Sequence, residues 1–212
     1  ILTEGSVEAV TLANNHSRDH FEQGMEDTKE VLDQKDIKHF GYDESCIVDV
    51  KGIKIGFLGY SFPYELTAEM KKAITDLKTK SDLVIIYYHW GIERDEAPMD
   101  SQRRIAKESI DAGADLIIGS HPHVLQGIET YKGKKIVYSL GNFCFGGNKN
   151  PSDKDTMIYQ HTFSFENDQL VKEDNQIIPC MISSTASRNN YQPTPVEGED
   201  ASRVLEKVNE IK

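Results

Sequence analysis

Two histidines separated by one proline follow a short apolar run near the middle of the chain. His121-Pro122-His123 comes directly after residues 116–119, which read Leu-Ile-Ile-Gly. Such a run is typical of a buried parallel strand, and catalytic groups in open α/β sheets collect just beyond the carboxyl ends of these strands. Proline fixes its own φ, so the spacing of the two imidazoles is held. Because histidine is the commonest side-chain ligand for borderline metals, the pair indicates a metal or acid–base centre.

The same arrangement recurs twice upstream, which strengthens this interpretation. Asn15 and His16 follow the strand-like residues 7–12, and His89 ends the strand-like residues 83–88. Three apolar strands therefore each lead into a histidine, so we expect these side chains to converge at one edge of a sheet. Three further histidines do not follow such runs and are interpreted as ordinary surface or loop residues: His20, His39 and His161.

Length and composition indicate one soluble globular domain spanning residues 1–212, with 38% hydrophobic and 28% charged residues. The net charge of −11 argues against a nucleic-acid partner, so an anionic substrate would be attracted by bound cations. No apolar stretch is long enough to span a bilayer, but the chain opens on Ile1 close to a strand, and we expect the natural protein to extend upstream. The three cysteines are interpreted as buried or incidental thiols: Cys46, Cys144 and Cys180.

The order of the expected elements is that of an α/β protein whose second half is rich in strands. The clearest helix covers residues 101–112, with Ile105, Ala106, Ser109 and Ile110 as its inner stripe and Gly113 as its stop. The remaining expectations are helices over 22–32 (stripe Met25, Thr28, Val31, Leu32), 67–77 and 202–211, hairpins over 46–58 and 127–139, strands over 157–165 and 176–183, a polar loop over 148–155 and a crossing segment over 189–200.

These residue types can hold transition metals. Neutral imidazole nitrogens and an asparagine carbonyl oxygen are suitable ligands for Zn, Mn or Fe. A two-metal centre also needs a bridging anion, and the chain shows no obvious carboxylate at a strand end. We therefore expect the acidic ligands to lie upstream of this chain.

Four sequence blocks, in this order, resemble the CapA-type capsule-biosynthesis proteins, a branch of the calcineurin-like metallophosphoesterase superfamily. The resemblance covers nearly the whole chain. It implies an α/β fold built as a four-layer α/β/β/α sandwich without its N-terminal portion, and a centre of two divalent ions (Mn, Fe or Zn) in the full-length protein. The blocks are Ala13-Asn14-Asn15-His16 with Asp19 and Gly24, His89-Trp90-Gly91 with Glu93, Gly113-Ala114-Asp115 through His123, and Tyr138-Ser139-Leu140-Gly141-Asn142-Phe143.

The resemblance also implies roles for individual residues. His16 matches the catalytic histidine of the superfamily. Asp19 is interpreted either as a helix-start carboxylate or as an acceptor that orients His16. Glu93 is a candidate pocket carboxylate or a solvated loop residue, and Asn142 a candidate substrate-binding amide or a turn residue. The implied metal ligands are Asn15, His89, His121 and His123.

Three functions remain open from the sequence. The first is a metal-dependent hydrolase that cleaves a phosphoester or related bond during handling of poly-γ-glutamate capsule polymer. The second is a non-catalytic polymer-binding or export subunit of a membrane-bound capsule synthase complex. A mononuclear zinc amidase is the weakest, because Asn-Asn-His is not an expected ligand pattern for it. The resemblance further implies an extracytoplasmic protein that is anchored to the membrane through a segment outside this chain.

Overall fold

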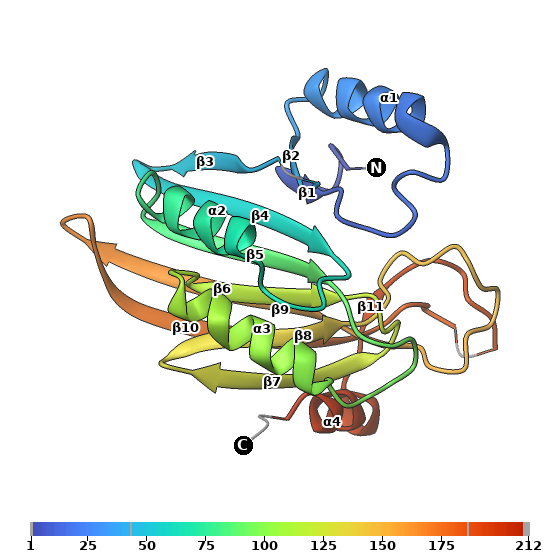
Figure 1. The fold of residues 1–212 in the computed structure, drawn as a ribbon. Coiled ribbons are helices and arrows are strands. Elements are labelled where there is room, and N and C mark those ends of the chain that lie inside the picture. Colours follow the sequence, from blue (N-terminus) through green and yellow to red (C-terminus); the bar gives the residue numbers. More distant parts are fainter. Residues whose placement is uncertain (1, 43, 186, 210–212) are drawn as a thin grey trace. The chain divides into compact units, whose positions relative to one another are not determined.

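The structure is a computed structural model that describes residues 2–42, 44–185 and 187–209 (Figure 1). The chain divides into two compact units. The first comprises residues 1–90, 100–119 and 131–136, and the second comprises residues 91–99, 120–130 and 137–212. Among the described residues, no helix is both long and apolar enough to cross a membrane. The single domain expected over residues 1–212 stays a prediction.

The first unit is a mixed sheet with helices. Its strand order is β3-β4-β5-β6-β8; β4 pairs with β5 in parallel and with β3 in antiparallel fashion. Mixed pairing of this kind, with helices between the parallel strands, is typical of α/β folds. The elements are β1 (Ala9–Thr11), α1 (Phe21–Asp33), β2 (Lys38–Phe40), β3 (Cys46–Val50), β4 (Ile53–Ser61), α2 (Ala68–Lys78), β5 (Leu83–His89), α3 (Asp100–Asp111), β6 (Leu116–Ser120) and the start of β8 (Lys134–Leu140).

Strand β5 forms the centre of this unit, as its apolar run predicts. Val84, Ile86 and Tyr88 are fully buried, and α2 lies on the β4–β5 pair (Figure 1). The backbone N–H of Val84 donates to the buried carboxylate of Asp115 at 2.8 Å, and the Lys78 ammonium donates to the same carboxylate at 2.7 Å. A buried carboxylate needs such partners. Asp115 thereby fixes where β5 starts relative to β6, and so where His89 ends β5.

Helix α3 confirms the predicted inner stripe and stop. Ile105, Ala106 and Ser109 are buried, as is Ile110. Gly113 takes φ +120°, its N–H donates to the Ile110 carbonyl at 3.0 Å, and the next N–H donates to the Ser109 carbonyl at 3.0 Å. These two bonds are those of a Schellman motif, which needs a residue with positive φ and so favours glycine. The chain can then turn directly into β6.

The first forty residues differ in part from the expectation. The strand expected over residues 7–12 is confirmed but shorter, and it pairs in parallel with β2, a strand the sequence analysis missed. Helix α1 is confirmed, with Met25 and Leu32 buried, but Thr28 and Val31 are exposed and do not belong to the inner stripe. Met25 and Leu32 are seven positions apart and share one face, whereas Val31 is turned by about 100° from Leu32 and faces solvent.

The second unit consists of strands, loops and one helix. Strands β9 and β10 form a long antiparallel hairpin, with β11 beside β10, and β7 neighbours β8. The hairpin predicted over 127–139 and the strands predicted over 157–165 and 176–183 are confirmed. The last of them, β10, starts seven residues and ends two residues earlier than predicted. The elements are β7 (Leu125–Tyr131), the end of β8, β9 (Asp155–Glu166), β10 (Gln169–Met181), β11 (Thr194–Pro195) and α4 (Gly198–Lys207).

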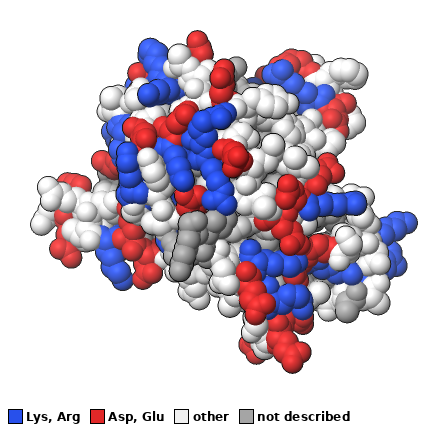
Figure 2. Space-filling model, turned by 60° about the horizontal axis from the view of Figure 1, so that its bottom comes forward, with Lys and Arg blue, Asp and Glu red and all other residues white. Residues whose placement is uncertain are grey.

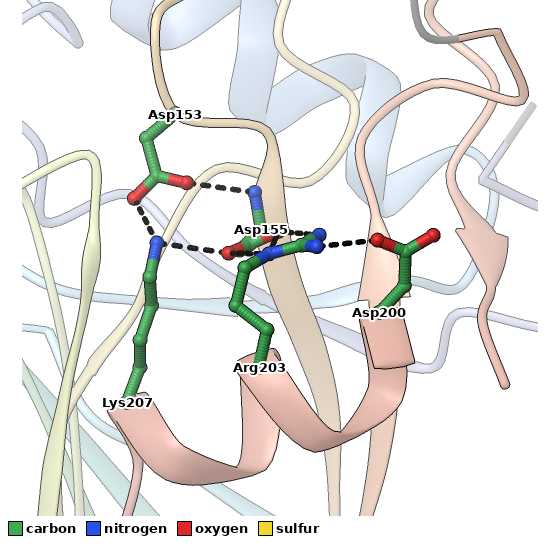
Figure 3. Close-up of polar contacts among 5 residues, drawn as sticks. All are labelled: Asp153, Asp155, Asp200, Arg203 and Lys207. Atoms are coloured by element: carbon green, nitrogen blue, oxygen red, sulfur yellow. Dashed lines mark hydrogen bonds and ion pairs between the residues drawn. The ribbon is translucent and has the colours of Figure 1, made fainter. Parts of the chain in front are cut away.

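Helix α4 is attached to the start of β9 by an ion-pair network (Figure 3). The Asp155 side chain is only 5% exposed, and it accepts hydrogen bonds from the Arg203 guanidinium (2.8 Å) and the Lys207 ammonium (2.8 Å). Burial acts to raise the pKa of Asp155, but the hydrogen bonds from these two cations outweigh it and hold that pKa below its usual range. Lys207 also binds Asp153 at 2.8 Å. Arg203 and Lys207 together neutralise the buried charge of the Asp155 carboxylate.

Basic and acidic side chains also lie beside one another on the surface. Figure 2 shows one face of the molecule, on which basic and acidic side chains are interspersed. Lys132 and Asp111 are one exposed pair, with 2.5 Å between the Nζ and Oδ1 atoms. Such surface pairs contribute little to stability because water and salt screen them.

Two expectations need correction. His39 and His161 are not surface or loop residues: they lie in β2 and β9 with side chains 15% and 5% exposed. The His161 ring lies 3.3 Å from the Glu173 carboxylate and the His39 ring 3.2 Å from that of Asp33, so both histidines are strand residues with carboxylate partners. The last helix begins and ends four residues earlier than expected, and the predicted end at Ile211 lies outside the described residues. The expectation for the cysteines is confirmed: all three are free thiols, with Cys180 buried and Cys144 exposed, and burial raises the pKa of the Cys46 thiol to about 11.

Candidate metal-binding site

The first candidate group lies in the loop between β1 and α1. The Asn14 Oδ1 atom accepts a hydrogen bond from the His16 backbone N–H at 2.8 Å, which closes a turn over Asn15. The Tyr42 hydroxyl donates to the Asn14 carbonyl and holds the loop from the other side. A Cβ atom at Gly59 would lie 2.7 Å from the Thr11 Oγ1, so this glycine lets β4 approach the end of β1 closely. The loop is thus held by contacts far apart in sequence.

This loop brings Asn15 to His89, as the sequence predicted for these two residues. The His89 Nε2 lies 2.8 Å from the Asn15 Oδ1, although 74 positions separate them. The Tyr87 hydroxyl lies 3.3 Å from the other ring nitrogen of His89, and Phe62 packs edge-on against the ring. Two ligand atoms that each bind one ion at about 2.1 Å lie roughly 3 Å apart, so this spacing fits a shared metal ion.

His16 and Asp19 form a pair next to this group. The His16 Nδ1–H donates to the Asp19 carboxylate at 2.8 Å, and the two side chains are 71% and 56% exposed. The carboxylate therefore orients the imidazole, and the Nε2 atom is left as the nitrogen that can exchange a proton with a ligand. The structure places Asp19 where the second of its two interpretations requires.

The second candidate group lies in the second unit. His121 and His123 both have positive φ, +99° and +61°, on either side of Pro122. This conformation is costly for a residue with a Cβ atom, and strain of this kind occurs most often where function requires it. One ligand atom from each of Glu93, His121 and His123 lies within 4.8 Å of the others. Two imidazoles and one carboxylate make a suitable ligand set for Zn, Mn or Fe.

The loop that carries Glu93 is tied to the histidine loop by main-chain hydrogen bonds. The Arg94 N–H donates to the Pro122 carbonyl at 2.7 Å. The buried Gln126 amide donates to the carbonyls of Asp95 (2.9 Å) and Ala97 (3.2 Å). These bonds place the Glu93 carboxylate beside the imidazoles, so the ligand group does not depend on the side chains alone.

Asn142 supports His123. The His123 Nδ1–H donates to the Asn142 Oδ1 at 2.7 Å, and the Asn142 Nδ2 donates to the His123 carbonyl at 3.2 Å. The amide thus fixes both the ring and its backbone, and the Nε2 atom is left for an ion. The Phe145 ring packs on the same imidazole, with 5.1 Å between the ring centroids.

The local sequence leaves the role of several residues in these groups open. Glu93 lies exposed in a loop, as one of its two interpretations expects, and its carboxylate also lies within 4.8 Å of the ligand atoms of His121 and His123. Its position four residues after the strand-end His89 was the available signal. The supporting contacts of Tyr42 and Gln126 were missed, because nothing in their local sequence marks them.

The family model of the bacterial capsule synthesis protein PGA_cap matches residues 1–147, and the chain belongs to this family. It is 34% identical over 170 residues to the capsule biosynthesis protein CapA of Bacillus anthracis, and 38% identical over 168 residues to the PGA biosynthesis protein CapA of Bacillus subtilis. Each match covers 68% of this chain but only 41% and 44% of those proteins. The chain therefore spans less than half the length of these curated relatives.

Solved structures agree with the expected fold. A hypothetical protein from Thermus thermophilus superposes with a TM-score of 0.53 at 15% identity, covering 84% of this chain and 79% of that one. A Staphylococcus aureus protein described as "Putative 5'-Nucleotidase" superposes with a TM-score of 0.56 at 14% identity, covering 94% of this chain and 41% of that one. The mixed α/β fold expected from the sequence is confirmed. Its four-layer metallophosphoesterase arrangement stays a prediction.

Proposed function

We propose that this protein is a metal-dependent hydrolase that acts on a phosphoester or a related bond in capsule polymer handling. The observation that carries the proposal is the Glu93, His121 and His123 group, whose ligand atoms lie within 4.8 Å on a strained backbone. The Asn15 and His89 pair, 2.8 Å apart, offers further ligands. Membership of a capsule synthesis family supports a role at the cell envelope.

The candidate residues would act either as metal ligands or as a proton donor. Asn15 and His89, and Glu93 with the two later histidines, would hold divalent ions. Such ions supply charge for binding a substrate anion and activate water. His16, oriented by Asp19, would donate a proton to the leaving oxygen through its Nε2 atom. That the two ligand groups serve one centre of two ions stays a prediction.

The substrate and partners belong to the same proposal. With a net charge of −11, the protein as a whole repels anions, so an anionic polymer or phosphoester would be held by the bound cations. We also propose an extracytoplasmic location, membrane anchoring through a segment outside this chain, and contact with capsule synthase subunits. The names of the two CapA relatives, a capsule and a PGA biosynthesis protein, support the role in capsule synthesis from which these points are proposed.

Metal analysis combined with a hydrolysis assay tests the proposal. Full-length protein should bind Mn, Fe or Zn and hydrolyse a generic phosphodiester such as bis(p-nitrophenyl) phosphate, or the native polymer. Hydrolysis should disappear with a chelator and return with added metal. Metal binding without turnover on any of these substrates would favour the polymer-binding or export subunit. Absence of bound metal would contradict the proposal.

A further inference from the structure

The segment that joins β8 to β9 contacts the candidate metal ligands. Asn142 hydrogen-bonds to the His123 ring at 2.7 Å, and the Phe145 ring packs on the same imidazole. The segment has no helix or strand between Leu140 and Asp155, so its own backbone bonds do not hold it in place. What fixes it must come from elsewhere in the chain.

One anchor is Asn189, a fully buried amide. Its Nδ2 donates to the carbonyls of Phe145 (2.9 Å) and Asn148 (3.1 Å), and its backbone N–H donates to the Lys149 carbonyl at 2.9 Å. The Asn189 Oδ1 accepts from the Tyr191 N–H at 2.9 Å. A buried amide with donors and acceptor all engaged holds its partners in one arrangement. Phe145 is thereby fixed at its backbone while its ring contacts His123.

A second anchor lies at the other end of the segment. The Thr156 hydroxyl donates to the Leu140 carbonyl at 3.1 Å, and a Cβ atom at Gly141 would lie 3.3 Å from the Asp155 carbonyl. The start of β9 thus packs directly on the two residues before Asn142. The Asp155 side chain is in turn bound by Arg203 and by a lysine of the same helix (Figure 3).

We infer that Asn189 is a positioning residue for the candidate metal group, and that the Asp155–Arg203 ion pair of α4 is its second anchor. The inference rests on the proposed function. Metal sites need ligands held within about 0.5 Å of their binding positions. Substitution of residues that support the ligands typically lowers metal affinity ~10–100-fold. Asn189 and α4 lie outside the residues 1–147 that match the family model, so the C-terminal part of the chain would complete a site whose ligands lie in the matched part.

Co²⁺ titration of the full-length protein, followed by visible absorption, tests this inference. Asn189→Asp keeps the size of the side chain but replaces the donating amide by an acceptor that repels the Phe145 and Asn148 carbonyls. We expect Co²⁺ to bind ~10–100-fold more weakly, with a changed absorption spectrum. The control is Asn190→Asp, because Asn190 bonds instead to Ser183 (2.9 Å) and Ser184 (3.1 Å), and it should keep the wild-type affinity and spectrum.

The outcomes separate the inference from the proposed function. If wild-type protein shows no Co²⁺ spectrum, the proposed function fails. If it binds Co²⁺ and the two variants bind equally well or equally poorly, Asn189 has no specific positioning role and the inference is overturned. If Asn189→Asp does not fold, Arg203→Met tests the second anchor: weakened Co²⁺ binding by folded protein supports the inference, and unchanged binding overturns it.

Discussion

The Asn142 side chain makes two hydrogen bonds to His123: its Oδ1 accepts from the ring Nδ1–H at 2.7 Å, and its Nδ2 donates to the backbone carbonyl at 3.2 Å. This reciprocal contact fixes the ring plane and the tautomer of His123, which presents its Nε2 atom for an ion. These two hydrogen bonds distinguish His123 from a histidine that is free to rotate in a loop. The relationship leads to the first prediction.

Asn142→Ala should weaken metal binding ~10–100-fold, because the His123 ring loses the partner that orients it. His123→Ala should abolish binding at this group. Asn150→Ala, in the same segment, is the control: its side chain accepts a hydrogen bond from Lys154, so the change should have little effect on affinity. Calorimetric titration with Zn²⁺ or Mn²⁺ on full-length protein measures all three. Unchanged affinity in Asn142→Ala would show that His123 does not need this orientation.

Glu93→Gln should lower metal affinity by about tenfold or more, because it removes the carboxylate from the Glu93, His121 and His123 group. Glu96→Gln, which removes the same charge from the same loop, is the matched control. Metal content after identical purification is the measurement. If the two variants lose equal amounts of metal, Glu93 acts only through general charge and is not a ligand.

His16→Ala should lower the rate of hydrolysis ~10²–10⁴-fold with nearly unchanged metal content, because a positioned general acid contributes that much without binding the ion. His121→Ala should lower both quantities. The rate and the metal content are measured on the same samples. Loss of metal from His16→Ala would show that this residue is a ligand. If neither variant alters capsule production in cells, the binding-subunit hypothesis replaces the catalytic one.

Arg203→Met should destabilise the protein by ~1–3 kcal/mol, below the usual cost of breaking a buried ion pair, since Arg203 is half exposed and Lys207 still binds Asp155. Asp200→Asn, which leaves the Asp155 contacts in place, should cost much less. Urea unfolding at pH 7 measures both. If Arg203→Met and Asp200→Asn destabilise the protein equally, the contact of Arg203 with the buried Asp155 does not contribute more to stability than its contact with Asp200.

The same network predicts a dependence of stability on pH. The pKa of Asp155 is lowered in the folded protein, so its contribution is fully present above the ordinary aspartate pKa, about 3.9, and is lost as the pH falls through the lowered value. Asp155→Asn should therefore differ most from wild type above pH ~4, and the difference should shrink at lower pH. Unfolding free energies measured from pH 2 to 7 test this; a difference that grows on acidification would contradict it.

The sequence alone determined the local features. The apolar run of β5, the stripe and glycine stop of α3, and the histidines that follow β5 and β6 all arise from near neighbours in the chain, where side-chain periodicity and backbone preferences act directly. The motif order also identified the family, which the match over residues 1–147 shows.

Only the tertiary structure decided which further side chains join and support the candidate ligands. The Glu93 loop reaches His121 and His123 through main-chain bonds that leave no mark in local sequence. Strand β2 was missed for the same reason, because its three residues form a strand only by pairing with β1. The burial of His161 in β9 likewise arises from residues that are distant in the sequence. Long-range packing is not encoded in any short window, so the support of the candidate site had to be seen in three dimensions.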